Sequence, residues 1–310
     1  MSNFVNDIGN ILITLGEYMN YFFALNRTFI SSIFVLAISF QSLPVKADMY
    51  SLSLRGLGKP QQKAFTDPAV NRYRHLVTEI ASSLSSKPLT PAETLGVSGF
   101  EFSLVSTHAD ISHDQEWWHG QPGMPVLEGG VNQRTVPGIM WVPSVQFRKG
   151  LPLSTEIGIS GTYMAFSKLF MMGAEVKTAL YESYYRWFPA IAVRGALNTL
   201  FGTGELNLTT GEVDVIASLA FGVGGMMQFT PYIGGGMMFV DAISGVLDQT
   251  PYSVSDRDND QRGGTGGSLY IFPRMDGADH TLQRIFGGVR FNMAYFAVFY
   301  EIDVLLPQYS

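Results

Sequence analysis

Hydrophobic and polar residues alternate with a period of two along most of the chain from residue 97 onward. In the first run, Phe100, Phe102 and Leu104 lie on one face, and Glu101 and Ser103 lie on the other. Because successive side chains of a strand point to opposite faces, this alternation predicts strands with one apolar face. Eight further runs alternate in the same way, within residues 139–148, 153–163, 172–180, 190–201, 213–221, 227–234, 284–293 and 296–304. The sequence therefore predicts an all-β, antiparallel fold.

The polar faces of these strands are poor in charge. Asp, Glu, Lys and Arg make up 15% of the chain, whereas soluble globular proteins carry about 25%. The polar positions hold mostly Gly, Ser, Ala and Thr, although the outer face of a soluble β-sandwich needs water-facing polar residues. We therefore expect a transmembrane up-and-down β-barrel with an enclosed polar face and a lipid-facing apolar face. A secreted soluble β-sandwich is the alternative architecture.

Charges on the polar faces are expected to point into the lumen of this barrel. They are Glu101, Arg148, Glu156, Glu175, Lys177, Arg194, Asp214, Arg290, Glu301 and Asp303. A small barrel has an interior only wide enough for side chains or for a narrow passage. Because an unpaired buried charge is costly, the acids and bases should pair. The pattern predicts either a packed polar interior or a narrow channel that prefers cations.

Aromatic residues recur near the ends of the predicted strands. A transmembrane barrel places aromatic girdles there, at the two membrane interfaces, and spans the bilayer with strands of about 10 residues. The predicted girdle residues are Trp141, Phe147, Tyr163, Phe188, Phe201, Phe221, Phe239, Tyr295 and Tyr300.

The N-terminal residues predict export. Thr28–Phe40 is an apolar run that follows a single base, Arg27, and precedes Val45-Lys46-Ala47. This run is too short to cross a hydrocarbon layer of about 30 Å and is followed by small residues, which is typical of a cleaved signal peptide. We expect a signal peptide over residues 1–47, with the true start at Met19; an uncleaved membrane anchor is the alternative.

One helix is expected between the signal peptide and the barrel. Asp67 can cap it, Pro68 suits its first position, and apolar residues recur at helical spacing from Val70 until Lys87 and Pro88 end the run. The sequence thus predicts a periplasmic segment over 48–96 with an amphipathic helix over 67–87, followed by a barrel over 97–305. This helix should either plug one mouth of the barrel or lie beneath it.

Three short motifs carry a family resemblance. They are Ala92-Glu93-Thr94-Leu95-Gly96, Arg148-Lys149-Gly150-Leu151-Pro152 and Gly287-Gly288-Val289-Arg290-Phe291. With the strand pattern, they make the chain resemble Gram-negative outer-membrane β-barrel proteins, and in particular small barrels of uncharacterised function. The resemblance implies the bacterial outer membrane as location, and membrane lipid and the barrel-assembly machinery as partners. It carries over no catalytic residue, and the chain departs from such barrels in ending on Ser310 rather than on an aromatic residue.

The resemblance also bears on the number of strands. Nine runs alternate, whereas bacterial single-chain barrels have an even number of strands. We therefore expect about ten strands, with eight or twelve open. The tenth would come from Tyr50–Leu57 or from Ser268–Phe272, both of which alternate.

Two long loops, over 109–135 and 242–282, hold the candidates for chemistry. His108, Asp110 and His113 in the first loop are weak candidates for a metal site or a hydrolytic site. In the second loop, Asp256, Asp258 and Asp260 have part of a calcium-loop pattern, but Gln261 replaces the glycine such loops require. The chain has no Cys, no Gly-x-Ser-x-Gly and no His-Glu-x-x-His. We therefore expect neither a metal nor a cofactor, and no enzyme.

These observations favour a non-enzymatic outer-membrane barrel, acting as a structural or surface-interaction protein or as a narrow restricted pore for small solutes or ions. The alternative is a barrel enzyme that hydrolyses lipid or peptide through His108, Asp110 and His113. Nucleic acid is excluded as a partner, because the formal charge of −6 and the pI of about 5.4 provide no basic face for phosphates.

Overall fold

The computed structural model describes residues 51–62, 66–119, 127–128, 138–165, 167–182, 188–223, 227–248, 269–278, 280–293 and 296–307. All of them belong to one compact unit, Ala47–Ser310. The expected signal peptide, the candidate ligands Asp256, Asp258 and Asp260, and the girdle residue Tyr295 lie outside the described residues.

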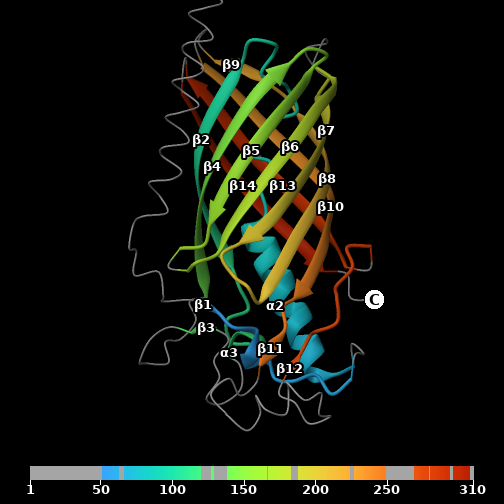
Figure 1. Ribbon diagram of the computed structural model, residues 1–310. Helices are drawn as coiled ribbons and strands as arrows, with labels where there is room; N and C mark the ends of the chain where they lie inside the picture. The colour runs from blue at the N-terminus through green and yellow to red at the C-terminus, as the bar shows by residue number, and fades with distance from the viewer. Residues whose placement is uncertain are drawn as a thin grey trace, which may run out of the picture. The chain divides into compact units, whose positions relative to one another are not determined.

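Nine long strands form one antiparallel sheet, and each corresponds to one of the nine predicted runs (Figure 1). Neighbours in sequence are neighbours in the sheet, so the topology is up-and-down. A short strand, β9 (Phe221–Val223), pairs only with the start of β10. The nine strands are β2 (Phe100–Asp110), β4 (Ile139–Leu151), β5 (Thr155–Tyr163), β6 (Phe170–Tyr181), β7 (Ala190–Phe201), β8 (Leu206–Ser218), β10 (Met227–Ser244), β13 (Thr281–Met293) and β14 (Phe296–Pro307).

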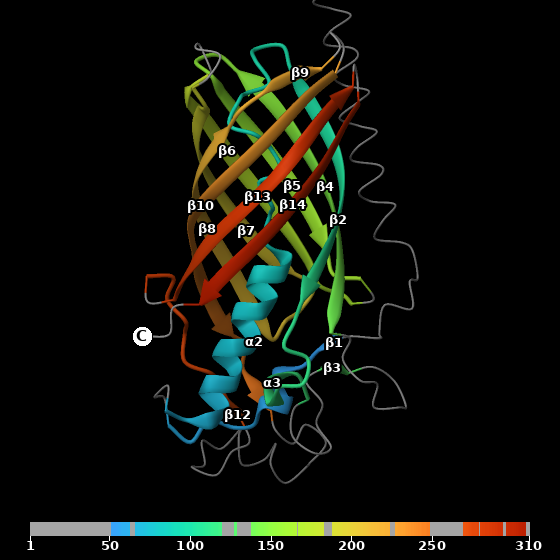
Figure 2. The same ribbon diagram turned by 180° about the vertical axis from the view of Figure 1, so that it is seen from behind.

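The sheet is curled like part of a barrel, with β2 and β14 as its two edges (Figures 1 and 2). No pairing joins these two edges among the described residues. The prediction of a tenth strand is wrong at both proposed places. Residues at the first place form β1 (Ser51–Leu52), which pairs with β3 (Leu127–Glu128), and then the 3-10 helix η1 (Leu54–Leu57). Those at the second form β12 (Leu269–Tyr270), which pairs with β11 (Leu247–Asp248).

Both segments alternate for too few residues to span the sheet. In η1, Leu54 and Leu57 are instead three residues apart on one side of a helical turn, and both are fully buried. Burial of two leucines favours the turn over an extended edge strand. The expectation of an even strand number therefore did not hold for the sheet.

Along all nine strands, burial alternates in step with the hydrophobic pattern of the sequence. Apolar residues line the convex outer face; Leu197 on β7 and Ile233 on β10, for example, are 66% and 63% exposed. On the outer face of these strands, Asp, Glu, Lys and Arg occur only at Asp110, Lys149 and Asp241, each near a strand end. A water-exposed sheet would be expected to carry charge along its whole length.

Two sets of connections lie at opposite ends of the sheet. At one end, which we call the helix end, lie the links over 111–138, 164–169, 202–205 and 245–280. At the other, the turn end, lie the links over 152–154, 182–189, 219–226 and 294–295. The two longest links therefore share the helix end.

Helix α2 (Pro68–Leu84) lies at the helix end and enters the space enclosed by the sheet, which we call the lumen (Figure 2). The prediction of a helix here is confirmed: the Asp67 side chain accepts a hydrogen bond from Ala69 N at 2.8 Å, and Pro68 occupies the first turn. Burial raises the pKa of the Asp67 carboxyl, but hydrogen bonds from Gln62, Ala69 and Gln61 outweigh this and lower it overall.

The apolar side of α2 packs in the main core. Tyr73 stacks on Phe272 with ring centroids 4.6 Å apart, and Trp118 of the short helix α3 (Glu116–His119) joins the same cluster. The Glu79 carboxylate of α2 accepts hydrogen bonds from the indole N–H groups of Trp117 and Trp118. These contacts fix α2 at the helix end and direct the following residues into the lumen.

Candidate functional site in the lumen

Residues Ser85–Leu95, which we call the inner segment, run along the lumen from the end of α2 toward β2. They contain no helix or strand, and most of them are buried. Beyond them, Gly96 has a φ of 70°, a conformation that favours glycine. The carbonyl of Gly99, just before β2, accepts a hydrogen bond from Gly150 N on β4. Since β2 begins at the turn end, the inner segment crosses the lumen from one end to the other.

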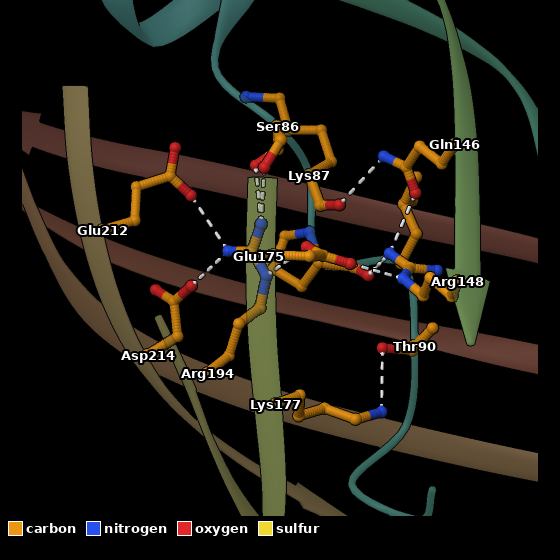
Figure 3. A network of polar contacts seen from close by, with 12 residues as sticks. Ser86, Lys87, Thr90, Gln146, Arg148, Glu175, Lys177, Arg194, Glu212 and Asp214 are labelled. Carbon is orange, nitrogen blue, oxygen red and sulfur yellow. Dashed lines mark hydrogen bonds and ion pairs between the residues drawn. The ribbon is translucent and has the colours of Figure 1, made fainter. Parts of the chain in front are cut away.

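The ten predicted lumen charges all occupy inner-facing positions of the strands. Arg148, Glu156, Lys177, Arg194 and Asp214 are each at most 3% exposed. Figure 3 shows several of them converging on the inner segment. The lumen is therefore lined by buried charge, as the sequence indicates.

Arg194 on β7 is the centre of this ion-pair network. Its Nε lies 2.7 Å from Glu175, and its Nη1 lies 2.9 Å from Glu212 and 2.7 Å from Asp214. Arg284 on β13 continues the network, with ion pairs of 2.9 Å to both Glu212 and Asp303. Charges from β6, β7, β8, β13 and β14 are thus joined across the lumen.

A second group of ion pairs lies around Arg148 on β4. Its guanidinium pairs with Glu175 at 2.5 Å and with Glu101 at 3.4 Å. Glu101 on the edge strand β2 also pairs with Arg290 on β13, which lies next to the other edge strand. The two margins of the sheet are therefore linked by an ion pair near the turn end. Separately, Lys177 pairs with Glu156 at 2.8 Å.

Three members of the network are absent from the sequence prediction. Glu212 was missed because the predicted strand starts at Val213, whereas β8 starts at Leu206. Arg284 lies on the polar side of the run over 284–293, next to the apolar Ile285, so the alternation alone indicates that Arg284 faces the lumen. Lys87, which pairs with Asp303 at 3.0 Å, belongs to the inner segment, and no strand pattern could place it in the lumen.

The inner segment fills the lumen through hydrogen bonds from the wall to its main chain. The carbonyls of Lys87 and Pro88 accept from Gln146 and Arg148 respectively. Lys177 Nζ donates to the carbonyls of Pro91 and Glu93. In the other direction, main-chain N–H groups donate to wall side chains: Leu89 to Glu301, Ala92 to Ser218, Thr94 to Glu182 and Leu95 to Glu156.

Fewer contacts involve side chains of the inner segment. Arg194 donates to Ser86 Oγ at 2.6 Å, and Lys177 donates to Thr90 Oγ1 at 3.2 Å. Thr94 Oγ1 donates to Glu182, and Lys87 pairs with Asp303 as described. The wall therefore contacts the inner segment mainly as a polypeptide backbone.

The candidate residues for metal binding or hydrolysis do not come together in a site. His108 and Asp110 point outward from β2, where His108 Nε2 lies 3.4 Å from Ser106 Oγ. His113 pairs with its neighbour Asp114 at 3.1 Å. Within the described part of the chain, no three His, Asp or Glu side chains are grouped so that they could hold a metal ion.

Aromatic residues form a cross-strand row at each end of the sheet. At the helix end, Tyr163 pairs with Phe170, which pairs with Phe201, and Trp141 lies nearby on β4. At the turn end, Phe221 pairs with Phe229, which pairs with Phe291; the last two rings have centroids 5.1 Å apart. Of the other predicted girdle residues, Phe188 lies at the turn end, whereas Phe147, Phe239 and Tyr300 lie within β4, β10 and β14.

No protein-family model, curated protein or solved structure matches this chain. Among the residues that the structure describes, no helix is both long and apolar enough to cross a membrane.

Proposed function

We propose that the protein is a non-enzymatic outer-membrane β-barrel protein whose lumen is closed by its own inner segment. It acts there as a structural or surface-interaction protein rather than as an open pore. The observation that carries this proposal is the outer face of the sheet, which is apolar on all nine strands and has charges only near strand ends. Water offers no stabilisation to such a surface, whereas the hydrocarbon core of a bilayer does.

The spacing of the aromatic rows agrees with a bilayer. On β6, Phe170 stands at the helix end and Tyr181 at the turn end, where its ring contacts Phe188. A strand of about 11 residues that rises about 3.3 Å per residue and tilts by about 40° spans roughly 25 Å along the membrane normal. That is the height of the apolar band of a transmembrane barrel.

The ion pairs and the inner segment favour a closed lumen over a channel. An aqueous path needs space and free polar groups, but Arg148, Lys177 and Arg194 each contact both an acid and the inner segment. Each of the bases Lys87, Arg148, Lys177, Arg194, Arg284 and Arg290 pairs with at least one acid. This pairing supports a packed interior over an open channel.

Reconstitution of the full chain into lipid vesicles and planar bilayers tests the proposal. We expect the protein to stay with vesicles after washing at high salt and high pH, and to show no stable current. Release from vesicles by the wash would contradict membrane insertion. A stable current in the intact protein would contradict the closed lumen, and its ion preference would identify a pore.

A further inference from the structure

The wall of the lumen has the features of a binding site for a peptide main chain. It donates to main-chain carbonyls through Gln146, Arg148 and Lys177, and it accepts from main-chain N–H groups through acids and through Ser218. Every residue except proline carries the same main-chain donor and acceptor. Contacts of this kind recognise a peptide backbone with little dependence on its side chains.

The wall donors are held in place by the acids behind them. Glu175 fixes Arg148 and Arg194, and Glu156 fixes Lys177. Each of these bases then directs a remaining N–H group toward the inner segment. Because the donors are already oriented and buried, a peptide that binds them loses little of its binding energy to ordering the site.

The inner segment has the composition of such a ligand. Pro88 and Pro91 lack an N–H group that would need a partner, and between them Leu89 has a φ of 50°, so the segment bends inside the lumen. Ser85, Ser86 and Ala92 are small and buried, and the segment pairs with no strand of the sheet. It is held in the lumen by the wall rather than by secondary structure.

We propose that the lumen is a binding site for a bent, proline-containing peptide without helix or strand, and that the inner segment is its built-in occupant. A peptide segment of the same kind from a partner protein then displaces the inner segment and takes its place. This inference goes beyond the proposed function, because the site depends on the lumen wall and operates in detergent as well as in a bilayer.

A cleavable variant tests the inference with the full chain already folded. A specific protease site is placed between Gly96 and Gly99, where Val97 is exposed. Because the chain has no native Cys, Thr90→Cys provides a single reporter thiol in the buried part of the inner segment. Leu153→Cys, in a turn where the native side chain is 91% exposed, provides the matched accessible control. The rate of thiol modification is measured in detergent before cleavage, after cleavage, and during titration with a synthetic peptide of sequence Ser85–Gly96.

We expect the thiol at position 90 to react at least about tenfold more slowly than the control thiol, both before and after cleavage, because the closed state is the populated one. Saturating peptide should raise its rate to that of the control. A peptide that keeps both prolines but has Ala at its other positions should also compete. Arg148→Gln and Lys177→Gln weaken the inner segment and the competing peptide alike, so they should raise the rate at position 90 in the absence of peptide, whereas Arg274→Gln, outside the lumen, should leave that rate unchanged.

Two results would overturn the inference. If the thiol at position 90 reacts as fast as the control immediately after cleavage, the wall does not hold the segment. If no peptide concentration changes the rate, the segment is part of a fixed core and not an exchangeable ligand. Ser86→Cys gives a second reporter should Thr90→Cys fail to fold. Since the assay is done in detergent, neither result decides whether the protein inserts into a membrane.

Discussion

Replacement of Arg194 by methionine is expected to destabilise the folded protein strongly. The side chain is 1% exposed and pairs with Glu175, Glu212 and Asp214. After the change, Glu175 still forms its ion pair with Arg148, and Glu212 still forms its ion pair with Arg284. Asp214 loses its closest base and keeps only Arg284, whose Nη1 lies 4.0 Å from Asp214 Oδ2.

The size of the effect follows from the loss of the closest partner of the Asp214 carboxylate. Asp214 is fully buried, and its Oδ1 already has no hydrogen-bond partner. Removal of one partner from a buried ion pair costs about 3–5 kcal/mol. We expect a loss of this size in the free energy of unfolding, measured by urea titration of the protein in lipid or detergent with tryptophan fluorescence as the probe.

Two further variants make this prediction specific. Arg194→Met combined with Asp214→Asn removes this poorly compensated buried charge and should recover at least about 1–2 kcal/mol. Arg274→Met breaks an exposed pair with Asp241, in which the arginine side chain is 58% exposed, and should have a much smaller effect because water screens that pair. Equal losses for Arg194→Met and Arg274→Met would refute the buried network, as would a double variant no more stable than Arg194→Met.

Three other perturbations test separate parts of the structure. Val213→Arg on the apolar outer face of β8 should cost about 2–4 kcal/mol if the proposed bilayer surrounds the sheet and the residue lies near its midplane. Val246→Arg, outside the sheet, should be tolerated, and equal tolerance in lipid folding assays would contradict the proposed environment. Burial lowers the pKa of His75 below 6.5, so its neutral form favours the folded state and stability should fall as the pH drops below 6.5; His75→Gln should reduce that fall in urea titrations across pH. Gly202 has a φ of 98° and would place a Cβ against the Lys168 carbonyl, while a Cβ at Gly204 meets nothing within 4 Å. Gly202→Ala should therefore lower the unfolding midpoint, and Gly204→Ala should leave it unchanged.

The strands could be predicted because their signal is local. A run such as Phe100 to Leu104 fixes which side chains share a face once it is extended, and this depends on no distant residue. The end of α2 was harder to predict. The run of apolar positions suggests a helix that continues to Lys87, but α2 ends at Leu84. Ser85 already has non-helical backbone torsions, and Pro88 follows three residues later.

The inner segment could not be predicted, because its place depends on long-range contacts. Lys87 and Asp303 are far apart in sequence yet form an ion pair of 3.0 Å. No periodicity marks a stretch whose main chain is bound by Arg148 and Lys177. For the same reason, the open edges of the sheet were not anticipated, since the number of strands alone does not determine how β2 and β14 meet.

Lipid contact of the outer face is the most direct test of the proposed function. Single cysteines at Leu197 and Ile233, which are exposed on the outer face, and at Leu153 in a turn can each be labelled with a fluorophore in the otherwise cysteine-free chain. In vesicles, the proposal predicts that brominated acyl chains quench the labels at 197 and 233, while a water-soluble quencher affects only the label at 153. Quenching of the labels at 197 and 233 from water, with no effect of brominated lipid, would contradict a membrane-embedded sheet.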